Sequence, residues 1–394
     1  MTDRQYPRRD FLRMAASGAA LTLVAPRLAL AKAATERRFV FVIQRGAADG
    51  LETLIPYADP GYARLRGAMA LDPATATHLD GSFALHPAMV ETARLHAARE
   101  ALFVHAVASP YRDRSHFDGQ NVLETGGTSP YQLKDGWLNR LVSQLPHADK
   151  EAIAFSATVP VALRGPVEVA SYAPSALPQA TDDLMLRVTQ LYQDDAQLHA
   201  LWSSAMDTRD IAMGGQGGAR PRQDGASTGK LAASFLARAD GPRIAMIETG
   251  GWDTHSAQNA RLAAQLRNLD AMVAALRDGM GSAWSETVVL VATEFGRTAA
   301  ANGTNGTDHG TGAMAMLLGG AVQGGRVLAD WPGLGNGNLL ENRDLRPTTA
   351  LDALIAQACG ECFAIEPSRL SRMLFPQGVA VPGGAGQALP RLLR

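Results

Sequence analysis

Short apolar runs recur along the chain, and segments with helical spacing separate them. The first run, at 39–44, reads FVFVIQ without interruption, which is typical of a strand buried on both faces of a parallel sheet. The same pattern predicts further strands at 101–107, 152–156, 243–248, 287–293 and 313–318.

The segments between these runs predict amphipathic helices. A long helix is marked by apolar residues three and four positions apart: Leu262, Leu266, Leu269, Val273, Leu276 and Met280. Residues 86–99 are amphipathic, a helix is predicted to open at 115–123, and another helical pattern starts at Thr348. Strands that alternate with helices predict an α/β fold, a three-layer α/β/α sandwich with a mostly parallel central sheet.

Two stretches interrupt this alternation. Residues 213–229 read MGGQGGARPRQDGASTG and are predicted to form a surface loop or linker, because they are rich in glycine and nearly free of core residues. The part before them, 158–210, holds a polar helical segment at 182–206. We expect a single domain over 32–394, with a cap or insertion at about 158–240.

The first residues predict an export signal. The pair Arg8-Arg9 is followed by Phe-Leu, then by an apolar stretch at 14–25 and the small-residue sequence ALA at 29–31. A charged start, a short apolar middle and a small-x-small end are typical of a secretory signal, and the twin arginine indicates the Tat route. The alternative, an amphipathic N-terminal helix of the mature fold, is disfavoured because the stretch has no polar face.

Charge and hydropathy then restrict the location and the partners. Cleavage after Ala31 would remove five Arg and two Asp, leaving 32 basic and 36 acidic residues and a net charge of −4. A mildly acidic chain excludes nucleic-acid binding by bulk electrostatics. No later apolar run approaches transmembrane length. We therefore predict a periplasmic or secreted protein whose partner is the Tat export machinery. After cleavage the chain would have no stable membrane span. The alternative is that the signal stays uncleaved and acts as a membrane anchor.

The two cysteines, Cys359 and Cys362, form C-G-E-C near the end of the last predicted helix. An oxidising compartment permits a disulfide between them, although so short a loop would add little stability. No second pair of metal ligands lies nearby, which disfavours a zinc site. The two cysteines are better explained as apolar residues of the helix core.

Ionisable residues gather beside the predicted strands, where ligands of open α/β sheets bind. They are Asp49 in RGAADG, Asp253 and His255 in ETGGWDTH, Glu294 and Arg297 in TEFGRT, and Asp308 and His309 in TDHGTG. Carboxylates and imidazoles are ligand types for Zn, Mn, Mg or Ca, so this placement predicts one or two divalent ions. Taken singly, each residue is better explained by a cap or a structural hydrogen bond; their joint placement is what favours metal binding.

A further cluster, DRSHFDGQN at 113–121, follows the strand at 101–107. Ser115 at a helix N-terminus would lie where backbone N–H groups favour an anion, and its hydroxyl could act as a nucleophile. Ser115 with Asp118 three residues later also fits a helix cap, and the two roles are compatible. His116 is a candidate substrate-binding residue in the same cluster.

These motifs, in this order after a Tat signal, resemble a bacterial family of exported proteins known as domain of unknown function fifteen-oh-one (DUF1501). The shared motifs are RGAADGL, RSHFDGQ, GGWDTH, TEFGRT and DHGTG. The family is grouped with the alkaline phosphatase-like superfamily of phosphatases, sulfatases and phosphoglycerate mutases. The resemblance implies a sheet between helical layers and two metal ions at its carboxyl edge.

The resemblance assigns roles to individual residues. Asp49 resembles the first-strand aspartate ligand, Ser115 the nucleophile, Asp253 with His255 a ligand pair, and His309 the late histidine ligand. Glu294-Phe295 stands where the superfamily has adjacent Asp-His, and Asp253 and His255 are separated by one residue where three are common. These departures are compatible with a single ion, a different metal, or a site that binds without turnover.

Two functions follow from these expectations. The first is a metal-dependent hydrolase of phosphate or sulfate esters, in which Ser115 attacks and Arg297 stabilises charge on the transferred group. Arg45 and Arg114, with His116, would bind the anionic ester. The alternative is a non-catalytic or degenerate member that acts as a secreted binding or assembly protein. A redox enzyme is disfavoured, because no dinucleotide motif follows a strand.

Overall fold

The structure is a computed structural model that describes residues 36–146, 151–173, 182–193, 195–216, 224–378 and 389–394. The chain divides into two units, Met1–Lys32 and Ala33–Arg394, and all described residues belong to the second. The predicted signal, its twin arginine and its cleavage point therefore lie outside the described residues.

The described part is built around one large sheet. Its strands are β1 (Arg38–Gln44), β5 (Ala101–Ala108), β6 (Ala152–Phe155), β7 (Ala170–Ser171), β8 (Ile244–Thr249), β9 (Thr287–Ala292), β10 (Ala313–Leu318), β11 (Arg326–Leu328) and β12 (Thr349–Ala350). They lie in the order β11-β5-β10-β9-β1-β8-β6-β7, and β12 also pairs with β5. All six predicted strands are confirmed to within one residue at each end. A small sheet joins β2 (Leu54–Ile55), β4 (Ala84–Leu85) and β3 (Thr77–His78).

One strand runs against the others. The pairs β1 with β8, β1 with β9, and β6 with β8 are parallel, whereas β10 is antiparallel to both of its neighbours, β5 and β9. The start of β10 therefore lies at the same edge of the sheet as the ends of β1, β5, β8 and β9. The segment before β10 meets the segments that follow the other four strands.

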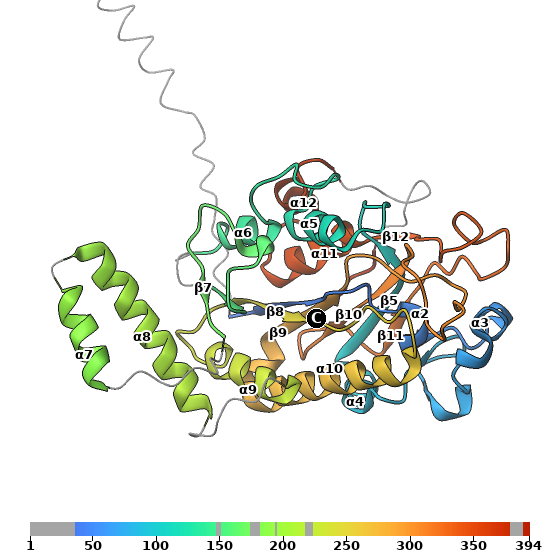
Figure 1. Ribbon diagram of the computed structural model, residues 1–394, viewed down its shortest axis with the longest axis horizontal. Coiled ribbons are helices and arrows are strands. Elements are labelled where there is room, and N and C mark those ends of the chain that lie inside the picture. Colours follow the sequence, from blue (N-terminus) through green and yellow to red (C-terminus); the bar gives the residue numbers. More distant parts are fainter. Residues whose placement is uncertain (1–35, 147–150, 174–181, 194, 217–223, 379–388) are drawn as a thin grey trace, which may run out of the picture. The chain divides into compact units, whose positions relative to one another are not determined.

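Helices cover both faces of this sheet (Figure 1). One face carries α5 (His116–Thr125), α6 (Trp137–Val142), α11 (Leu351–Cys362) and α12 (Pro367–Leu374), and the other carries α4 (Val90–Ala97), α9 (Gly225–Leu236) and α10 (Gln258–Met280). Alternate residues of β1 enter the two cores, Phe39 and Phe41 on one side and Val40 and Val42 on the other. The predicted three-layer α/β/α sandwich with a mostly parallel sheet is confirmed.

The remaining helices lie mostly outside these two layers. They are α2 (Gly50–Thr53), α3 (Pro60–Arg66), α7 (Asp182–Leu191) and α8 (Ala196–Gln216), with short 3-10 turns at Gly67–Met69, Pro73–Thr75, Val161–Leu163 and Gly281–Glu286. The polar helical segment predicted at 182–206 contains α7 and the first part of α8, which continues beyond it to Gln216.

The predicted loop at 213–229 is wrong at both of its ends, since α8 continues to Gln216 and α9 begins at Gly225. The Asp224 side chain caps α9 by accepting a hydrogen bond from the Ser227 N–H at 2.8 Å. A Cβ atom on Gly225 would lie 1.9 Å from the Asn268 carbonyl oxygen of α10. The glycines that suggested a loop instead let α9 pack closely on α10, so this part of the predicted cap belongs to the core.

Cys359 and Cys362 are both buried in α11, and neither is in a disulfide. Burial raises the pKa of both thiols, that of Cys362 to about 12. The structure therefore confirms that they are core residues and contradicts a disulfide between them. No helix in the described ranges is long and apolar enough to cross a membrane.

His105 on β5 is a buried neutral histidine, and it predicts an acid-sensitive fold. Its Nδ1 accepts a hydrogen bond from the Ala106 N–H, and its Nε2 lies 3.0 Å from the Leu54 carbonyl oxygen. Burial lowers its pKa from 6.5 to about 4. As the pH falls between these values the unfolded chain gains a proton that the folded chain excludes, so stability is lost.

We expect His105 to account for a loss of about 2 kcal/mol in the free energy of unfolding between pH 7.5 and pH 5. Urea denaturation at the two pH values measures it. His105→Gln, which retains a donor and an acceptor, should show a smaller loss, and His199→Gln on exposed α8 should match the wild type. An equal loss in all three proteins would contradict the assignment.

Candidate metal centre

Five segments meet at the edge of the sheet where β10 begins. Four of them follow β1, β5, β8 and β9, and the fifth precedes β10. Backbone hydrogen bonds join them, including Gly296 N to Thr311 O at 3.0 Å and Thr307 N to Thr254 O at 3.3 Å. Gly46 has φ of +119°, and a Cβ there would lie 2.7 Å from the Asp253 nitrogen, so the first segment needs glycine to pass this closely.

Three imidazole rings converge on the carboxylate of Asp253. Nε2 of His255 lies 3.0 Å and Nε2 of His309 lies 3.3 Å from Asp253 Oδ1, and Nε2 of His116 lies 3.5 Å from Oδ2. The Nε2 atoms of His255 and His309 are 3.0 Å apart. One ligand atom from each of His116, Asp253 and His309 falls within 4.8 Å of the other two. The structure thus brings together three of the predicted metal residues, with His116 as the addition.

The other nitrogen of each ring faces an oxygen acceptor. Nδ1 of His116 lies 2.9 Å from Glu294 Oε1, Nδ1 of His255 lies 3.2 Å from Asp308 Oδ1, and Nδ1 of His309 lies 2.9 Å from the Arg114 carbonyl oxygen. Carbonyl and carboxylate oxygens only accept, so each Nδ1 carries the hydrogen. In the neutral ring, Nε2 then presents a lone pair.

This arrangement fits a divalent cation. Lone pairs of His255 and His309 face each other at 3.0 Å beside a carboxylate, and Nε2 of His116 is buried without a hydrogen-bond partner. Buried polar atoms left unpaired are costly, and a cation among these donors would pair all of them. Imidazole nitrogen with carboxylate oxygen suits Zn, Mn and related ions.

The charges around the centre set the pKa values of its members. Burial alone would raise the pKa of the Asp253 carboxyl, but the hydrogen bond and charge of Arg297 hold it below its usual value. The hydrogen bond to Glu294 raises the pKa of His116, whereas burial and the neighbouring His116 lower that of His309. A hydrogen bond from Asn302 lowers the pKa of Asp308.

Arg297 is placed differently from the sequence expectation. Its side chain is fully buried, and the guanidinium donates to the carbonyl oxygens of Ala47, Gly46, Trp252 and Thr307 and to Asp253 Oδ1 at 2.6 Å. A guanidinium that is buried and engaged in this way does not reach a substrate anion. The predicted direct role in charge stabilisation is corrected to a positioning role toward Asp253.

Asp49 and Glu294, two of the predicted ligands, are also buried and saturated by the protein. Asp49 accepts from Arg66 at 2.5 and 3.0 Å, from Gln258 at 2.7 Å and from the Glu52 N–H at 3.1 Å. Glu294 touches the centre through His116. Asp308, with a side chain 54% exposed, reaches it through His255.

The two arginines predicted to bind substrate are paired with carboxylates. Arg45 bonds to Glu124 at 2.8 Å and to Glu248, and Arg114 bonds to Glu341 at 2.6 Å and Asp344 at 2.9 Å. Both are therefore neutralised, which corrects their expected role. Sequence reasoning missed Arg261, an exposed residue of α10 that donates to the Asp253 carbonyl at 3.2 Å. Within the described ranges it forms no ion pair.

Ser115 lies between two residues that contact the centre. Arg114 accepts the hydrogen bond from His309 through its carbonyl, and His116 points its ring at Asp253. Ser115 takes the N-cap position of α5, yet its side chain makes no capping hydrogen bond. The prediction of a helix position is confirmed, and the hydroxyl is left available for another role.

Phe295, the residue after Glu294, forms a wall of the centre. Its ring stacks on His116 with an interplanar angle of 22° and lies 5.3 Å from His309 between centroids. The Phe295 ring therefore gives apolar support to the imidazoles of His116 and His309.

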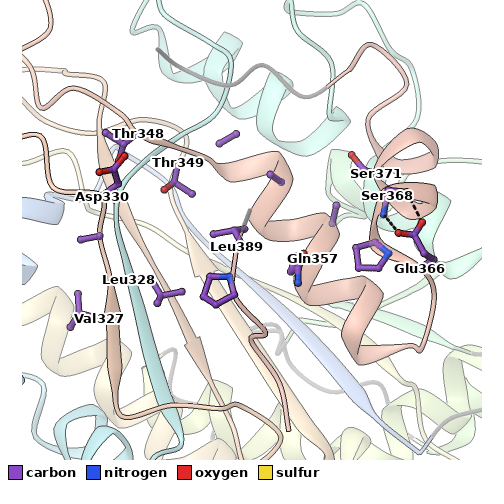
Figure 2. Close-up of a pocket in the computed structure, with 16 residues that line it drawn as sticks. Val327, Leu328, Asp330, Thr348, Thr349, Gln357, Glu366, Ser368, Ser371 and Leu389 are labelled. Carbon is purple, nitrogen blue, oxygen red and sulfur yellow. Dashed lines mark hydrogen bonds between the residues drawn. The ribbon is translucent and has the colours of Figure 1, made fainter. Parts of the chain in front are cut away.

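A separate cavity of about 920 Å³ lies among β11, β12, α11 and α12. Figure 2 shows its lining, with Asp330 and Thr348 on one side and Gln357, Glu366 and Ser368 on the other. No member of the centre lines it, so it belongs to a different part of the molecule.

Comparisons with known proteins add a family and distant structural likenesses. The family described as Protein of unknown function (DUF1501) matches residues 36–371, and no curated protein matches the chain. The C-terminal periplasmic domain of EcEptC from Escherichia coli, in complex with Zn, shares 10% identity over 73% of this chain and 74% of that chain, with a TM-score of 0.38. PsFucS1 sulfatase from Pseudoalteromonas sp. shares 12% identity over 97% and 78%, with a TM-score of 0.39. Likenesses of this size do not indicate a shared reaction.

We expect His309→Ala and Asp253→Asn to lose most of the metal bound by the wild type. Each removes a donor, and metal at 100 times its Kd would stabilise the wild type by about 2.7 kcal/mol that the variants lack. Elemental mass spectrometry on protein purified without chelator or nickel, together with thermal melts, measures both effects. His199→Ala is the control, and unchanged metal content in the two site variants would contradict the centre.

Proposed function

Since the chain belongs to the DUF1501 family of proteins of unknown function, we propose an activity from the centre itself: hydrolysis of phosphate or sulfate esters, dependent on metal, with Ser115 as nucleophile. The observation that carries this proposal is the convergence of three Nε2 atoms on Asp253. Ser115 lies between Arg114, whose carbonyl accepts from His309, and His116, which is one of the three rings.

The backbone around Ser115 supports a nucleophile at this position. Arg114 has φ of +61°, the left-handed region that most side chains avoid, so the chain turns sharply just before Ser115. The Ser115 N–H donates to the Tyr111 hydroxyl at 3.1 Å, which fixes the turn. The ten-residue helix α5 begins at the next residue, and its free N–H groups favour a negative group there.

The proposed reaction has two stages. A bound divalent ion would supply Lewis-acid polarisation of an ester oxygen and lower the barrier to charge build-up. The Ser115 oxygen forms a bond to phosphorus or sulfur while the ester bond breaks, and the leaving alcohol takes up the proton that the hydroxyl loses. Water then releases the covalent group from Ser115 and restores the hydroxyl.

The protein holds the carboxylate and the imidazole rings of the centre in fixed positions. Arg297 holds Asp253 in place through a partly buried hydrogen bond, and the acceptors on each Nδ1 fix the orientation of the three rings. Arg261 is the cation that we propose for contact with the ester anion, because its guanidinium is exposed beside Asp253.

One observation favours a second candidate, a metal-binding protein without turnover. Arg45 and Arg114, which would bind an anionic substrate, are each neutralised by two carboxylates. Such a protein would retain the centre and act in binding or assembly.

The proposal extends to location. A Tat signal at 1–31 would direct the folded protein to the periplasm or the medium, with the export machinery as its partner. Metal loading before export is compatible with this route, because the chain would cross the membrane already folded.

Ser115→Ala is expected to abolish hydrolysis of aryl phosphate and aryl sulfate esters while metal content stays at the wild-type level. The hydroxyl is the group that forms the new bond, and it makes no capping hydrogen bond whose loss would unfold α5. Release of the aryl alcohol and elemental analysis on the same preparations measure the two quantities. Asp118→Ala, three residues further along α5, serves as the control variant.

Retained turnover in Ser115→Ala would refute the nucleophile. Wild-type protein that binds metal but cleaves neither ester class would instead favour the binding function.

A further inference from the structure

We infer that the centre binds one divalent ion, through His116, Asp253, His309 and His255, and that Glu294 positions His116 without being a ligand. This inference rests on the metal centre of the proposed function but not on hydrolysis. It replaces the two-ion arrangement that the family resemblance implied.

Most acceptor sites of Glu294 are already taken by donors of the protein. It is fully buried, and its Oε1 accepts from the Gly46 N–H at 2.9 Å, from His116 Nδ1 at 2.9 Å and from Gln120 Nε2 at 3.0 Å. Its Oε2 accepts from the Thr293 hydroxyl at 2.9 Å. A carboxylate offers about four such sites, and binding an ion would break contacts that the fold already makes.

Asp49, the other carboxylate expected to hold a second ion, is also occupied by donors of the protein. Asp49 forms a two-bond ion pair with the buried Arg66 and also accepts from Gln258. Separating a buried ion pair leaves an uncompensated charge and costs several kcal/mol. Asp49 and Glu294, the residues expected to hold a second ion, therefore already have partners within the protein.

The charges around the centre also favour one divalent ion over two. Asp253, Asp308 and Glu294 surround the rings together with the guanidinium of Arg297, and Arg261 places a second guanidinium beside the Asp253 carbonyl, which gives a charge of −1 with neutral imidazoles. Nearby, Arg114 and Arg343 are balanced by Glu341 and Asp344. One divalent ion brings the centre to +1, and a second would bring it to +3.

Glu294 acts on the ion through the ring of His116. The hydrogen bond from Nδ1 fixes which nitrogen carries the proton and turns Nε2 toward Asp253 at 3.5 Å. A carboxylate in this position also makes the opposite nitrogen a stronger donor, and losing it typically weakens metal binding 10-fold to 100-fold. Phe295 stacks on the ring and limits its rotation.

Apo protein titrated with Co²⁺ or Zn²⁺ tests the inference without any substrate. We expect one equivalent per chain, visible Co²⁺ absorption that saturates at that ratio, and a Kd 10-fold to 100-fold higher in Glu294→Gln at unchanged stoichiometry. Glu248→Gln, a carboxylate of the same sheet edge that pairs with Arg45, should bind as the wild type does.

A double-mutant cycle separates positioning from general damage. If Glu294 acts through His116, the double variant of Glu294→Gln with His116→Ala binds no more weakly than His116→Ala alone. Melting of the apo proteins reports folding, and Glu294→Asp, which withdraws the oxygen by one methylene, replaces Glu294→Gln if that variant does not fold.

Each outcome of the metal titration supports or overturns a named part of the inference. Two equivalents per chain would overturn the single-ion centre, and an unchanged Kd in Glu294→Gln would overturn the positioning role. Absence of binding in the wild type would overturn this inference and the metal dependence of the proposed function together. One tightly bound ion without ester hydrolysis would support the inference and remove the proposed function.

Discussion

The buried guanidinium of Arg297 is the interaction on which the centre depends. It follows β9, and it donates to carbonyl oxygens of the segments after β1 and β8 and before β10, as well as to Asp253. One side chain therefore joins three connections of the sheet: the one after β1, the one after β8 and the one between β9 and β10. A buried cation without these partners would be very costly, so the loops and the arginine hold each other in place.

The direction of β10 is the second constraint. Because it runs antiparallel to β5 and β9, the DHG motif that precedes it reaches the edge where the parallel strands end. His309 then lies between His255 and His116, from segments that follow β8 and β5. A parallel β10 would have placed Asp308 and His309 at the opposite edge of the sheet.

The acidic residues of this edge divide into two classes. Asp253 and Asp308 have partly exposed side chains that face histidines, whereas Asp49 and Glu294 are buried and satisfied by protein donors. The first class is available to a ligand or to the rings that bind one. The second class gives rigidity, which a metal centre requires if its donors are to keep their positions.

The sequence by itself determined the layers of the fold and the edge at which chemistry gathers. Uninterrupted apolar strands and helical spacing act locally, and they placed all six predicted strands to within one residue. It failed at 225–229, where glycines serve helix packing, because sequence alone does not show what a glycine faces. Only the tertiary structure decided which acids are free and which are paired. Arg66 and Arg297 are distant in sequence from most of their partners, and His116 comes to the centre from the start of α5 with its Nδ1 against Glu294.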